Sequence, residues 1–394
     1  MRVLFLGAGE MGAAAALASL NTPSLTSIVI ADRDEPRALA LANSLIPAAP
    51  FGVTIGTRAV DATDAASLRD ALSDADVVMN AAGPFYRFGA SILQAAIETG
   101  THYVDICDDW EPTLAMLELD AAAREAGVVA LVGMGASPGA SNLLAMLAVE
   151  GLDEVEDLYT CWGVELDDEN RSHPVSAATI HWIHQLAGDI RIADGGRLTD
   201  TQPLEGVQLD YPGVGRGVVY TVGHPEPVTL VNTVKASGRI LNAMVMPTTV
   251  IAAIGTVRHD IQAGELTIED GARALFNVDE ARHARIVEAL PALGEPGPLP
   301  HFFALATGRR NGQRVVSACR PATMPDGMAR ATGIPMSIGL RFILEQKGRP
   351  GVHAPEQVVD PRWFFEALAP HCVPPIEDAA SMVMSSACMS HAKS

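Results

Sequence analysis

Apolar runs alternate with stretches of helical composition along the first third of the chain. Short runs with few polar interruptions are typical of strands buried on both faces, and helices between them join parallel strands. The pattern predicts an α/β fold with a doubly wound parallel (Rossmann) sheet, which binds ligands at the carboxyl ends of its strands. The predicted strands lie at 3–6, 28–32, 53–61, 76–80, 102–106 and 128–132.

Helices are predicted between these strands, at 13–20, 65–72, 90–98 and 113–126. Gly100 and Gly127 follow two of them directly, at the position where a left-handed residue ends a helix. Ser137 and Pro138 are interpreted as the N-cap and first residue of a further helix that leaves the sheet.

The pattern changes at about residue 153, where short β-like runs broken by Gly and Pro begin. Asn311-Gly312 is a strong signal for a two-residue hairpin. We predict a second, α+β domain built on a mixed or antiparallel sheet. Its strands are expected at 158–164, 218–222, 229–235, 302–308 and 313–320, and its helices at 177–186, 248–263 and 279–290.

The first strand runs into a glycine-rich turn, Gly7-x-Gly9-x-x-Gly12. Gly7 permits the tight turn, Gly9 lets backbone N–H groups approach a pyrophosphate, and Gly12 lets the helix pack on the strand. A strand before the turn and a helix after it predict a dinucleotide at the helix N-terminus. Glu10 and Met11, which lie within the turn, are assigned to the cofactor with the glycines.

Asp32 ends the second strand and decides the choice of cofactor. A carboxylate there accepts hydrogen bonds from ribose hydroxyls and repels a 2′-phosphate, which favours NAD. Arg33 could pair with that phosphate, so NADP stays open. Asp61, after the third strand, is expected to meet the adenine amino group.

These features divide the chain into four segments. Residues 1–140 form a dinucleotide-binding domain, and 141–327 form a substrate-binding and dimerisation domain. Two helices within 328–375, the second capped by Asp360, return to the first domain. The tail, 376–394, has no clear period, and we expect it to be partly disordered.

The composition narrows the classes of partner. The formal net charge is −20, which disfavours nucleic acid and anionic membranes. Met1-Arg2-Val3 leads straight into the first strand without a signal peptide, and no apolar run is long enough to span a bilayer, so a cytoplasmic location is expected. Five cysteines without a CxxC pair fit reduced thiols better than disulfides or a zinc site.

With the glycine turn, several later motifs give the chain a resemblance, over nearly its whole length, to the saccharopine dehydrogenase family, especially its lysine 6-dehydrogenase-like branch. These motifs are Asn80-Ala81-Ala82-Gly83-Pro84-Phe85, His102-Tyr103-Val104-Asp105, Gly-Ala-Ser-Pro-Gly-Ala-Ser-Asn at 135–142, Gly-His-Pro-Glu-Pro at 223–227 and Gly-Val-His-Ala-Pro-Glu at 351–356.

The resemblance implies an NAD(P)-dependent oxidoreductase that acts on a CH–NH bond of a small amino-acid-derived amine or imine, without a metal. Two alternatives stay open. One is a carboxynorspermidine-type reductive condensation of an aldehyde with an amine. The other is a non-catalytic dinucleotide-sensing protein, suggested by the acids and arginine crowded into 167–172. By analogy a homodimer is expected through the second domain's sheet, whose apolar face would otherwise be exposed.

Three residues are catalytic candidates. Tyr86 aligns with a tyrosine near the family's reacting centre and would donate to or orient the amine; otherwise it is a half-buried aromatic with a hydrated hydroxyl. Asp105 would serve as a general base if burial raised its pKa, or else belong to a helix cap. His224 is a substrate contact or a turn residue fixed by the adjacent proline.

Loops after the fourth, fifth and sixth strands are expected to surround the nicotinamide. Cofactor contacts are assigned to Asn80, Ala81, Gly83, Pro84 and Gly135. Substrate contacts are assigned to Asp109, Asn142 and Arg216, although Asp109 could instead cap a helix and Arg216 could be a solvent-exposed loop residue. Arg171, Lys235 and Arg239 are further cations, whereas His173, His181 and His184 are more simply structural.

Overall fold

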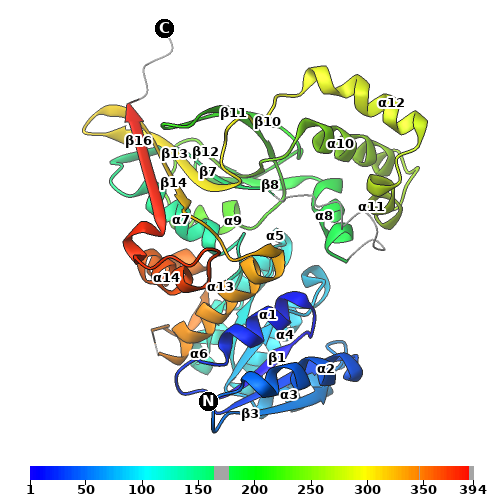
Figure 1. Cartoon of the computed structure of the whole chain (residues 1–394), viewed down its shortest axis with the longest axis vertical. Helices are drawn as coiled ribbons and strands as arrows, with labels where there is room; N and C mark the ends of the chain where they lie inside the picture. Colours follow the sequence, from blue (N-terminus) through cyan, green and yellow to red (C-terminus); the bar gives the residue numbers. More distant parts are fainter. Residues whose placement is uncertain (164–176, 346, 390–394) are drawn as a thin grey trace. The chain divides into compact units, whose positions relative to one another are not determined.

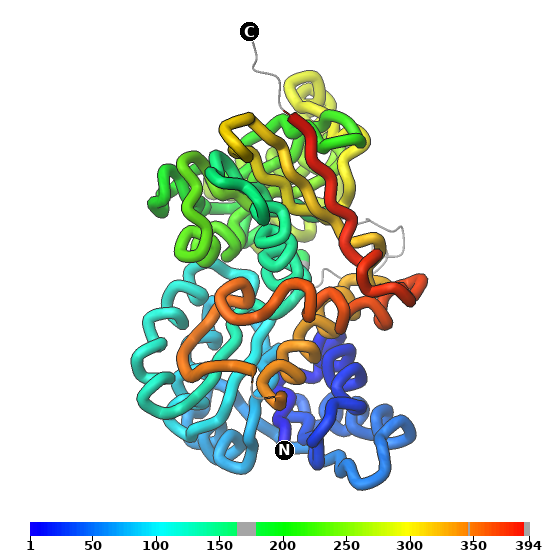
Figure 2. The backbone as a smooth tube through the Cα atoms, turned by 90° about the vertical axis from the view of Figure 1, so that its left-hand side faces the viewer, coloured from blue at the N-terminus to red at the C-terminus, as the bar shows by residue number. Residues whose placement is uncertain are grey.

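A computed structural model of the protein describes residues 1–163, 177–345 and 347–389. These residues form two compact units. Unit 1 comprises 1–143 with the described part of 321–383, and unit 2 comprises the described parts of 144–320 and 384–389. Within unit 1, the late segment (orange to red) runs beside the N-terminal segment (blue to cyan), as Figure 2 shows.

Unit 1 is built on a seven-stranded parallel sheet, which confirms the predicted fold class. The strand order is β15-β6-β5-β4-β1-β2-β3, and it reverses between β1 and β4, where such sheets bind ligands. The strands are β1 (Arg2–Leu6), β2 (Ser27–Asp32), β3 (Thr54–Ala59), β4 (Val77–Asn80), β5 (His102–Asp105), β6 (Val129–Leu131) and β15 (Gly351–His353).

Two of these strands differ from the sequence pattern. The prediction of a buried third strand is wrong, because β3 lies at the edge of the sheet and its residues are mostly exposed. β15 is an additional strand from late in the chain that pairs in parallel with β6. Three residues are too few to show a hydrophobic period, so the sequence pattern did not reveal it.

Helices pack around this sheet (Figure 1). Gly100 and Gly127 have φ of 70° and 68° and end α4 and α6, as predicted. The helix expected at 113–126 is instead two helices, α5 and α6. The helices are α1 (Glu10–Ser19), α2 (Glu35–Leu45), α3 (Ala65–Ser73), α4 (Phe85–Thr99), α5 (Trp110–Leu117), α6 (Asp120–Ala126), α13 (Gly327–Leu344) and α14 (Pro361–Leu368).

The helix expected to begin at Pro138 begins later, so that prediction is wrong. α7 (Ala140–Val149) starts after a tight loop in which Gly139 has a φ of 119°. A Cβ at Gly139 would overlap the backbone of Gly135. This close approach of two glycines moves the start of the helix past the Ser-Pro pair.

Helix α13 packs closely on unit 1 through two glycines. A Cβ at Gly333 would lie 2.6 Å from the carbonyl oxygen of Met11 in α1, and one at Gly339 would lie 2.7 Å from Cγ of Met134. Glycine inside a helix costs about 1 kcal/mol relative to alanine, so its presence here is explained by the close approach. The late helix thereby braces the start of α1 and the loop after β6.

Unit 2 is built on a mixed sheet of nine strands, as the predicted second domain requires. The main path is β10-β11-β12-β7-β13-β14-β16, with β8 and β9 attached beside β12; the pair β12–β7 is parallel. The strands are β7 (Glu154–Trp162), β8 (Ile190–Asp194), β9 (Arg197–Thr201), β10 (Gly206–Tyr211), β11 (Gly215–Thr221), β12 (Arg239–Met244), β13 (Phe302–Arg310), β14 (Gln313–Pro321) and β16 (Val383–Met389).

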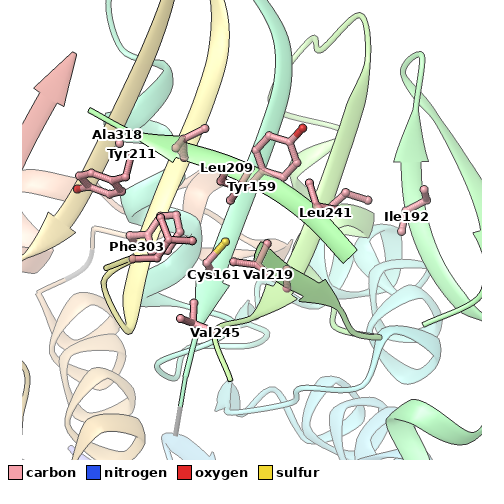
Figure 3. Close-up of a cluster of buried hydrophobic side chains, with 14 of the residues drawn as sticks. Tyr159, Cys161, Ile192, Leu209, Tyr211, Val219, Leu241, Val245, Phe303 and Ala318 are labelled. Atoms are coloured by element: carbon pink, nitrogen blue, oxygen red, sulfur yellow. The ribbon is translucent and has the colours of Figure 1, made fainter. Parts of the chain in front are cut away.

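This sheet curls over its own apolar face (Figure 3). The rings of Tyr211 in β10 and Phe303 in β13 meet edge to face at 5.3 Å, although the two strands are not neighbours in the sheet. Cys161 and Leu241, on the same face, are 1% and 0% exposed. The expectation that this face would be bare without a second subunit is therefore wrong, and the homodimer stays a prediction without that support.

Several elements of unit 2 differ from the sequence expectation. The segment 229–235 is not a strand, because helix α9 (Glu226–Leu230) occupies its start. Pro227 sets a helical φ in the first turn and outweighs the β-branched residues that follow. Strands β8, β9, β10 and β12 were not predicted, and neither was the strand β16, which lies in the tail where partial disorder was expected.

Other predictions for unit 2 are confirmed. Asn311 and Gly312 have φ of 51° and 76°, which suits the two-residue hairpin joining β13 to β14. The helices of the unit are α8 (Ala177–Ala187), α9, α10 (Thr248–Gln262), α11 (Ile268–Phe276) and α12 (Glu280–Ala289); α8, α10 and α12 were predicted, whereas α9 and α11 were not. Among the described residues, none of the helices has both the length and the apolar character needed to cross a membrane.

Candidate functional site

The glycine-rich turn closes tightly between β1 and α1. Gly7 has a φ of 101°, and a Cβ there would lie 2.7 Å from the carbonyl carbon of Ala81. A Cβ at Gly12 would overlap the carbonyl oxygen of Gly7. Side chains at either position would push α1 away from the carboxyl ends of β1 and β4.

Gly9 differs from these two because the space beside it is open. It is the N-cap of α1 and supplies no side-chain cap, and nothing lies within 4 Å of the place where its Cβ would be. A helix N-terminus with open space beside it fits an anion such as a pyrophosphate. Glu10, exposed, and Met11, partly buried, begin the helix at this point.

Asp32, at the end of β2, is fixed toward this turn. Its Oδ2 accepts a hydrogen bond from the N–H of Ala8 at 2.8 Å, and its Oδ1 accepts one from the N–H of Asp34 at 3.0 Å. A carboxylate offers about four acceptor positions, so each oxygen keeps capacity for a hydroxyl donor. The arrangement holds a negative charge at the position where a ribose is expected.

Arg33 and Asp61 follow the ends of the adjacent strands β2 and β3, whose last residues Asp32 and Ala59 are paired. Thr63 donates two hydrogen bonds to Oδ1 of Asp61, at 2.7 Å from its hydroxyl and 2.8 Å from its N–H. These bonds lower the pKa of Asp61, and the charge of Arg33 lowers it further. Both side chains are exposed, so their mutual attraction is screened by water.

Asn80, at the end of β4, is completely buried and makes two hydrogen bonds. Its Nδ2 donates to the hydroxyl of Tyr103 at 2.9 Å, and its Oδ1 accepts from the N–H of Ala82 at 3.1 Å. The second bond fixes the start of the loop that contains Gly83 and Pro84. A Cβ at Gly83 would meet nothing within 4 Å, so the loop borders open space.

Asp105, at the end of β5, is also completely buried. Its Oδ2 accepts from the Tyr103 hydroxyl at 2.8 Å, and its Oδ1 accepts from the N–H groups of Cys107 at 3.1 Å and Gly133 at 2.6 Å. Burial raises its pKa to about 6, against the opposing effect of these hydrogen bonds. The carboxyl group is enclosed within unit 1.

Tyr86 and Asp109 lie at the starts of two helices that follow β4 and β5. Tyr86 is the second residue of α4 and is 47% exposed, so its ring is accessible. Asp109 is 2% exposed and occupies the N-cap position of α5, but its side chain makes no cap hydrogen bond. Helix capping therefore does not explain its carboxylate.

The motifs at 135–142 and 351–356 meet within unit 1. Asn142 Nδ2 donates to Oε2 of Glu356 at 2.9 Å, and Asn142 Oδ1 accepts from the N–H of Gly139 at 3.0 Å. Asn142 is 0% exposed, and the hydrogen bond from its amide to Glu356 joins the two motifs in the interior. Gly135 is also closely packed, since a Cβ there would lie 3.2 Å from Cγ2 of Thr332.

A buried polar cluster in unit 2 contains His224. Its Nδ1 lies 3.5 Å from Oε2 of Glu226, and its ring lies 5.2 Å from the ring of Trp162. Asn242 Nδ2 donates to Oε1 of Glu226 at 2.8 Å and to Oγ1 of Thr160 at 2.9 Å. Asn242 Oδ1 accepts from the indole N–H of Trp162 at 2.8 Å, which completes the cluster.

Two cations of unit 2 form ion pairs outside this cluster. Arg216 lies in strand β11 and not in a flexible loop, so that expectation is wrong, and it pairs with Asp210 of β10 at 2.8 Å. Arg239 pairs with Glu205 at 2.8 Å, and Lys235 is exposed. His181 and His184 lie one turn apart on α8. Arg171, His173 and the segment 167–172 lie outside the described residues.

The members of these networks that sequence reasoning missed include Tyr103, Glu226, Asn242 and Glu356. Three of them belong to the quoted motifs, where each was treated as part of a pattern and not as a hydrogen-bonding group. Tyr103 could have been found, because parallel pairing sets Asn80 beside Asp105. Asn242 gave no such signal, since its strand was not predicted.

Comparison of the sequence with known proteins shows one matching family and several distant relatives. Residues 3–131 match the family described as the saccharopine dehydrogenase NADP binding domain. A carboxyaminopropylagmatine dehydrogenase of Synechocystis is 24% identical over 66% of this chain and 67% of its own length. A carboxynorspermidine synthase of Vibrio alginolyticus is 24% identical over 57% of this chain and 58% of its own length.

A solved structure has the same fold. The apo saccharopine dehydrogenase (L-Glu forming) of Saccharomyces cerevisiae matches 98% of this chain and 99% of its own, with a TM-score of 0.64 and 16% sequence identity. At this identity the likeness concerns the fold alone.

Proposed function

Because residues 3–131 belong to the saccharopine dehydrogenase NADP binding domain family, we propose that this NAD(P)-binding oxidoreductase acts on a CH–NH bond of a small amino-acid-derived amine or imine. The observation that carries the proposal is the turn from β1 to α1. Gly7 of this turn packs against the backbone of Ala81, and the N–H of Ala8 donates to Asp32. The relatives named for carboxyaminopropylagmatine and carboxynorspermidine support the same type of bond.

The residues present fit a dinucleotide. The backbone N–H groups around Gly9 would hold the pyrophosphate, because open space and a helix N-terminus coincide there. Asp32 would accept hydrogen bonds from the adenosine ribose, and the loop 81–84 would border the nicotinamide. A bound nicotinamide would supply hydride exchange with the carbon of the CH–NH bond.

We favour NAD over NADP on the electrostatics of this edge. The two hydrogen bonds to Asp32 hold its carboxylate in place, so it does not turn aside for a 2′-phosphate without losing them. Arg33, the cation available for that phosphate, is attracted by Asp61. The fixed carboxylate of Asp32 is the main effect that disfavours a phosphate on the ribose, because water screens the attraction between Arg33 and Asp61.

Within unit 1 we assign Tyr86 and Asp109 to the substrate, and within unit 2 we separately propose His224 as a group for proton transfer. Tyr86, which is 47% exposed, would orient the amine through its hydroxyl, and Asp109 would bind a substrate ammonium group. His224, whose Nδ1 lies 3.5 Å from Oε2 of Glu226, would exchange the proton that the amine gains or loses. We do not assign Asn142 to the substrate, because its buried amide joins the motif at 135–142 to the motif at 351–356.

A second candidate is a carboxynorspermidine-type reductive condensation, which the two curated relatives favour. The two reactions differ in what must be present for the cofactor to change its redox state. Absorbance at 340 nm tests them: we expect NAD to be reduced when an amino acid such as L-lysine is added alone. Oxidation of NADPH only with a carbonyl compound and an amine together would establish the second candidate.

The sensor hypothesis makes the opposite prediction. A dinucleotide sensor binds NAD or NADP but shows no turnover under either condition. A thermal shift with both dinucleotides and a panel of amino acids and diamines separates binding from catalysis, since each bound ligand raises the melting temperature. No shift with either dinucleotide would contradict the proposed function itself.

A further inference from the structure

One continuous set of hydrogen bonds joins the loops that follow β4, β5 and β6. It begins at the N–H of Ala82, in the loop after β4, and runs through Asn80 and the Tyr103 hydroxyl to Asp105. It ends at the N–H of Gly133, in the loop after β6. All three loops are therefore tied to a single carboxyl group.

The donor and acceptor roles along this set are fully assigned. Asn80 donates to the Tyr103 hydroxyl, so the hydroxyl proton is directed to Asp105. The other oxygen of Asp105 accepts from two backbone N–H groups, that of Cys107 in the loop after β5 and that of Gly133 in the loop after β6. Each of the three side chains is 0% exposed, so water does not replace a bond that is lost.

We propose that Asp105 is a positioning residue, which acts through Tyr103 and Asn80 to set the nicotinamide half of the dinucleotide site. The inference rests on the proposed function, because it concerns the cofactor assigned there. It replaces the role of general base for Asp105. A general base must reach the proton it removes, and this carboxyl group is enclosed among its partners.

The position of the network explains why only half of the cofactor depends on it. A doubly wound sheet binds the adenosine half of a dinucleotide over one set of strands and the nicotinamide half over the other. Asp32 and Asp61 follow β2 and β3, and neither is bonded to the network. The loops that the network ties follow β4, β5 and β6.

Two substitutions separate this role from general stability. Tyr103→Phe keeps the ring but removes the bond that joins Asn80 to Asp105. Asp105→Asn keeps an acceptor for Cys107 and Gly133 and can donate to the Tyr103 oxygen, so it preserves the ties between the loops. A matched control is Tyr211→Phe, which removes a buried hydroxyl in unit 2 for which no hydrogen-bond partner occurs among the described residues.

The experiment compares the affinity of the full chain for NADH and for ADP-ribose by titration calorimetry. ADP-ribose lacks the nicotinamide, so it reports on the adenosine half alone. We expect Tyr103→Phe to weaken NADH binding by about tenfold, the effect of about one buried hydrogen bond, and to leave ADP-ribose within about twofold. Asp105→Asn and Tyr211→Phe should bind both ligands as the unaltered chain does.

Equal weakening of both ligands by Tyr103→Phe, or no weakening of NADH, would overturn the positioning role. If Tyr103→Phe does not fold, Asn80→Ser breaks the same tie and should show the same selective loss. An unaltered chain that binds neither NADH, NADPH nor ADP-ribose would overturn the proposed function, which is a distinct outcome.

Discussion

Two buried networks, one in each unit, use similar groups for different purposes. In unit 1, Asp105 and Asn80 end neighbouring strands, the hydroxyl of Tyr103 joins them, and the network ties loops to one another. In unit 2, Asn242 and Thr160 are paired residues within the parallel strands β12 and β7. That network attaches the turn before α9 to the face of a sheet.

The difference lies in what each carboxyl group receives. Asp105 accepts two backbone N–H donors, which stay in place whatever side chain other than that of proline their residues carry. Glu226 accepts a hydrogen bond from a side chain, the amide of Asn242, at 2.8 Å. Removal of the Asp105 carboxylate therefore leaves buried backbone N–H groups without an acceptor. Removal of the Glu226 carboxylate leaves a side-chain donor, which can rotate toward another acceptor.

Asp105→Ala should have the largest effect of any single change in either network. It leaves two backbone N–H groups and the Tyr103 hydroxyl buried without an acceptor, and each costs about 1–3 kcal/mol. We expect a loss of about 4 kcal/mol in the free energy of unfolding, measured with urea. Asp105→Asn is the control and should lose less, because it keeps the acceptor for both N–H groups and deprives only the Tyr103 hydroxyl proton of its acceptor; equal losses in both variants would contradict this account.

The pH dependence of stability should show Asp105 as well. Its pKa is raised from 3.8 to about 6 in the folded protein, so the folded state binds a proton more tightly than the unfolded chain does. The stabilising effect of that proton is complete below pH 4 and is lost as the pH rises to about 6, a change of about 3 kcal/mol.

Asp105→Asn is the reference for this measurement, because other carboxyl groups titrate in the same range. The difference in unfolding free energy between the unaltered chain and Asp105→Asn should shift by about 3 kcal/mol in favour of the unaltered chain as the pH falls from 7 to 4. A difference that stays constant would show that burial does not perturb Asp105 in this way.

The two networks also differ in how far the sequence predicts them. The turn from Gly7 to Gly12 and Asp32 were predicted, because strand, turn and helix form one local unit with a known spacing. Asp105 was placed correctly at the end of a strand. Its enclosure was not predicted, since the N–H of Gly133 comes from a different strand and depends on the order of strands in the sheet.

In unit 2 the limits of sequence reasoning are greater. Asn242 and Thr160 are 82 positions apart, and β12, which carries Asn242, has only six residues. Helix α9 was not predicted, because the β-branched residues that follow favoured a strand. Pro227, at the start of the segment, is typical of the first turn of a helix. The sheet curls so that Phe303 and Tyr211 meet. This curvature depends on tertiary packing, which the hydrophobic pattern of the sequence does not predict.

Asn242→Ala should have an intermediate effect. It removes partners from the Trp162 indole N–H, from Glu226 and from the Thr160 hydroxyl, and about 1 kcal/mol for each predicts a loss of about 3 kcal/mol in unfolding free energy. The matched control is Asn232→Ala, an exposed asparagine with a single bond to Val228, which should lose less than about 0.5 kcal/mol. A loss at Asn242 as large as that of Asp105→Ala would remove the contrast between side-chain and backbone donors.

Arg216→Gln should have the smallest effect, because its ion pair with Asp210 joins two strands at the surface. The side chains of Arg216 and Asp210 are 69% and 54% exposed, and such pairs contribute less than about 1 kcal/mol. We expect unfolding free energy to fall by no more than that, and less at high salt, where the pair is screened. The KM for an amino-acid substrate should stay within about twofold of the unaltered chain, since losing an ionic contact to a substrate costs about tenfold or more. A rise in KM of that size without a change in stability would restore Arg216 as the anchor of a substrate carboxylate.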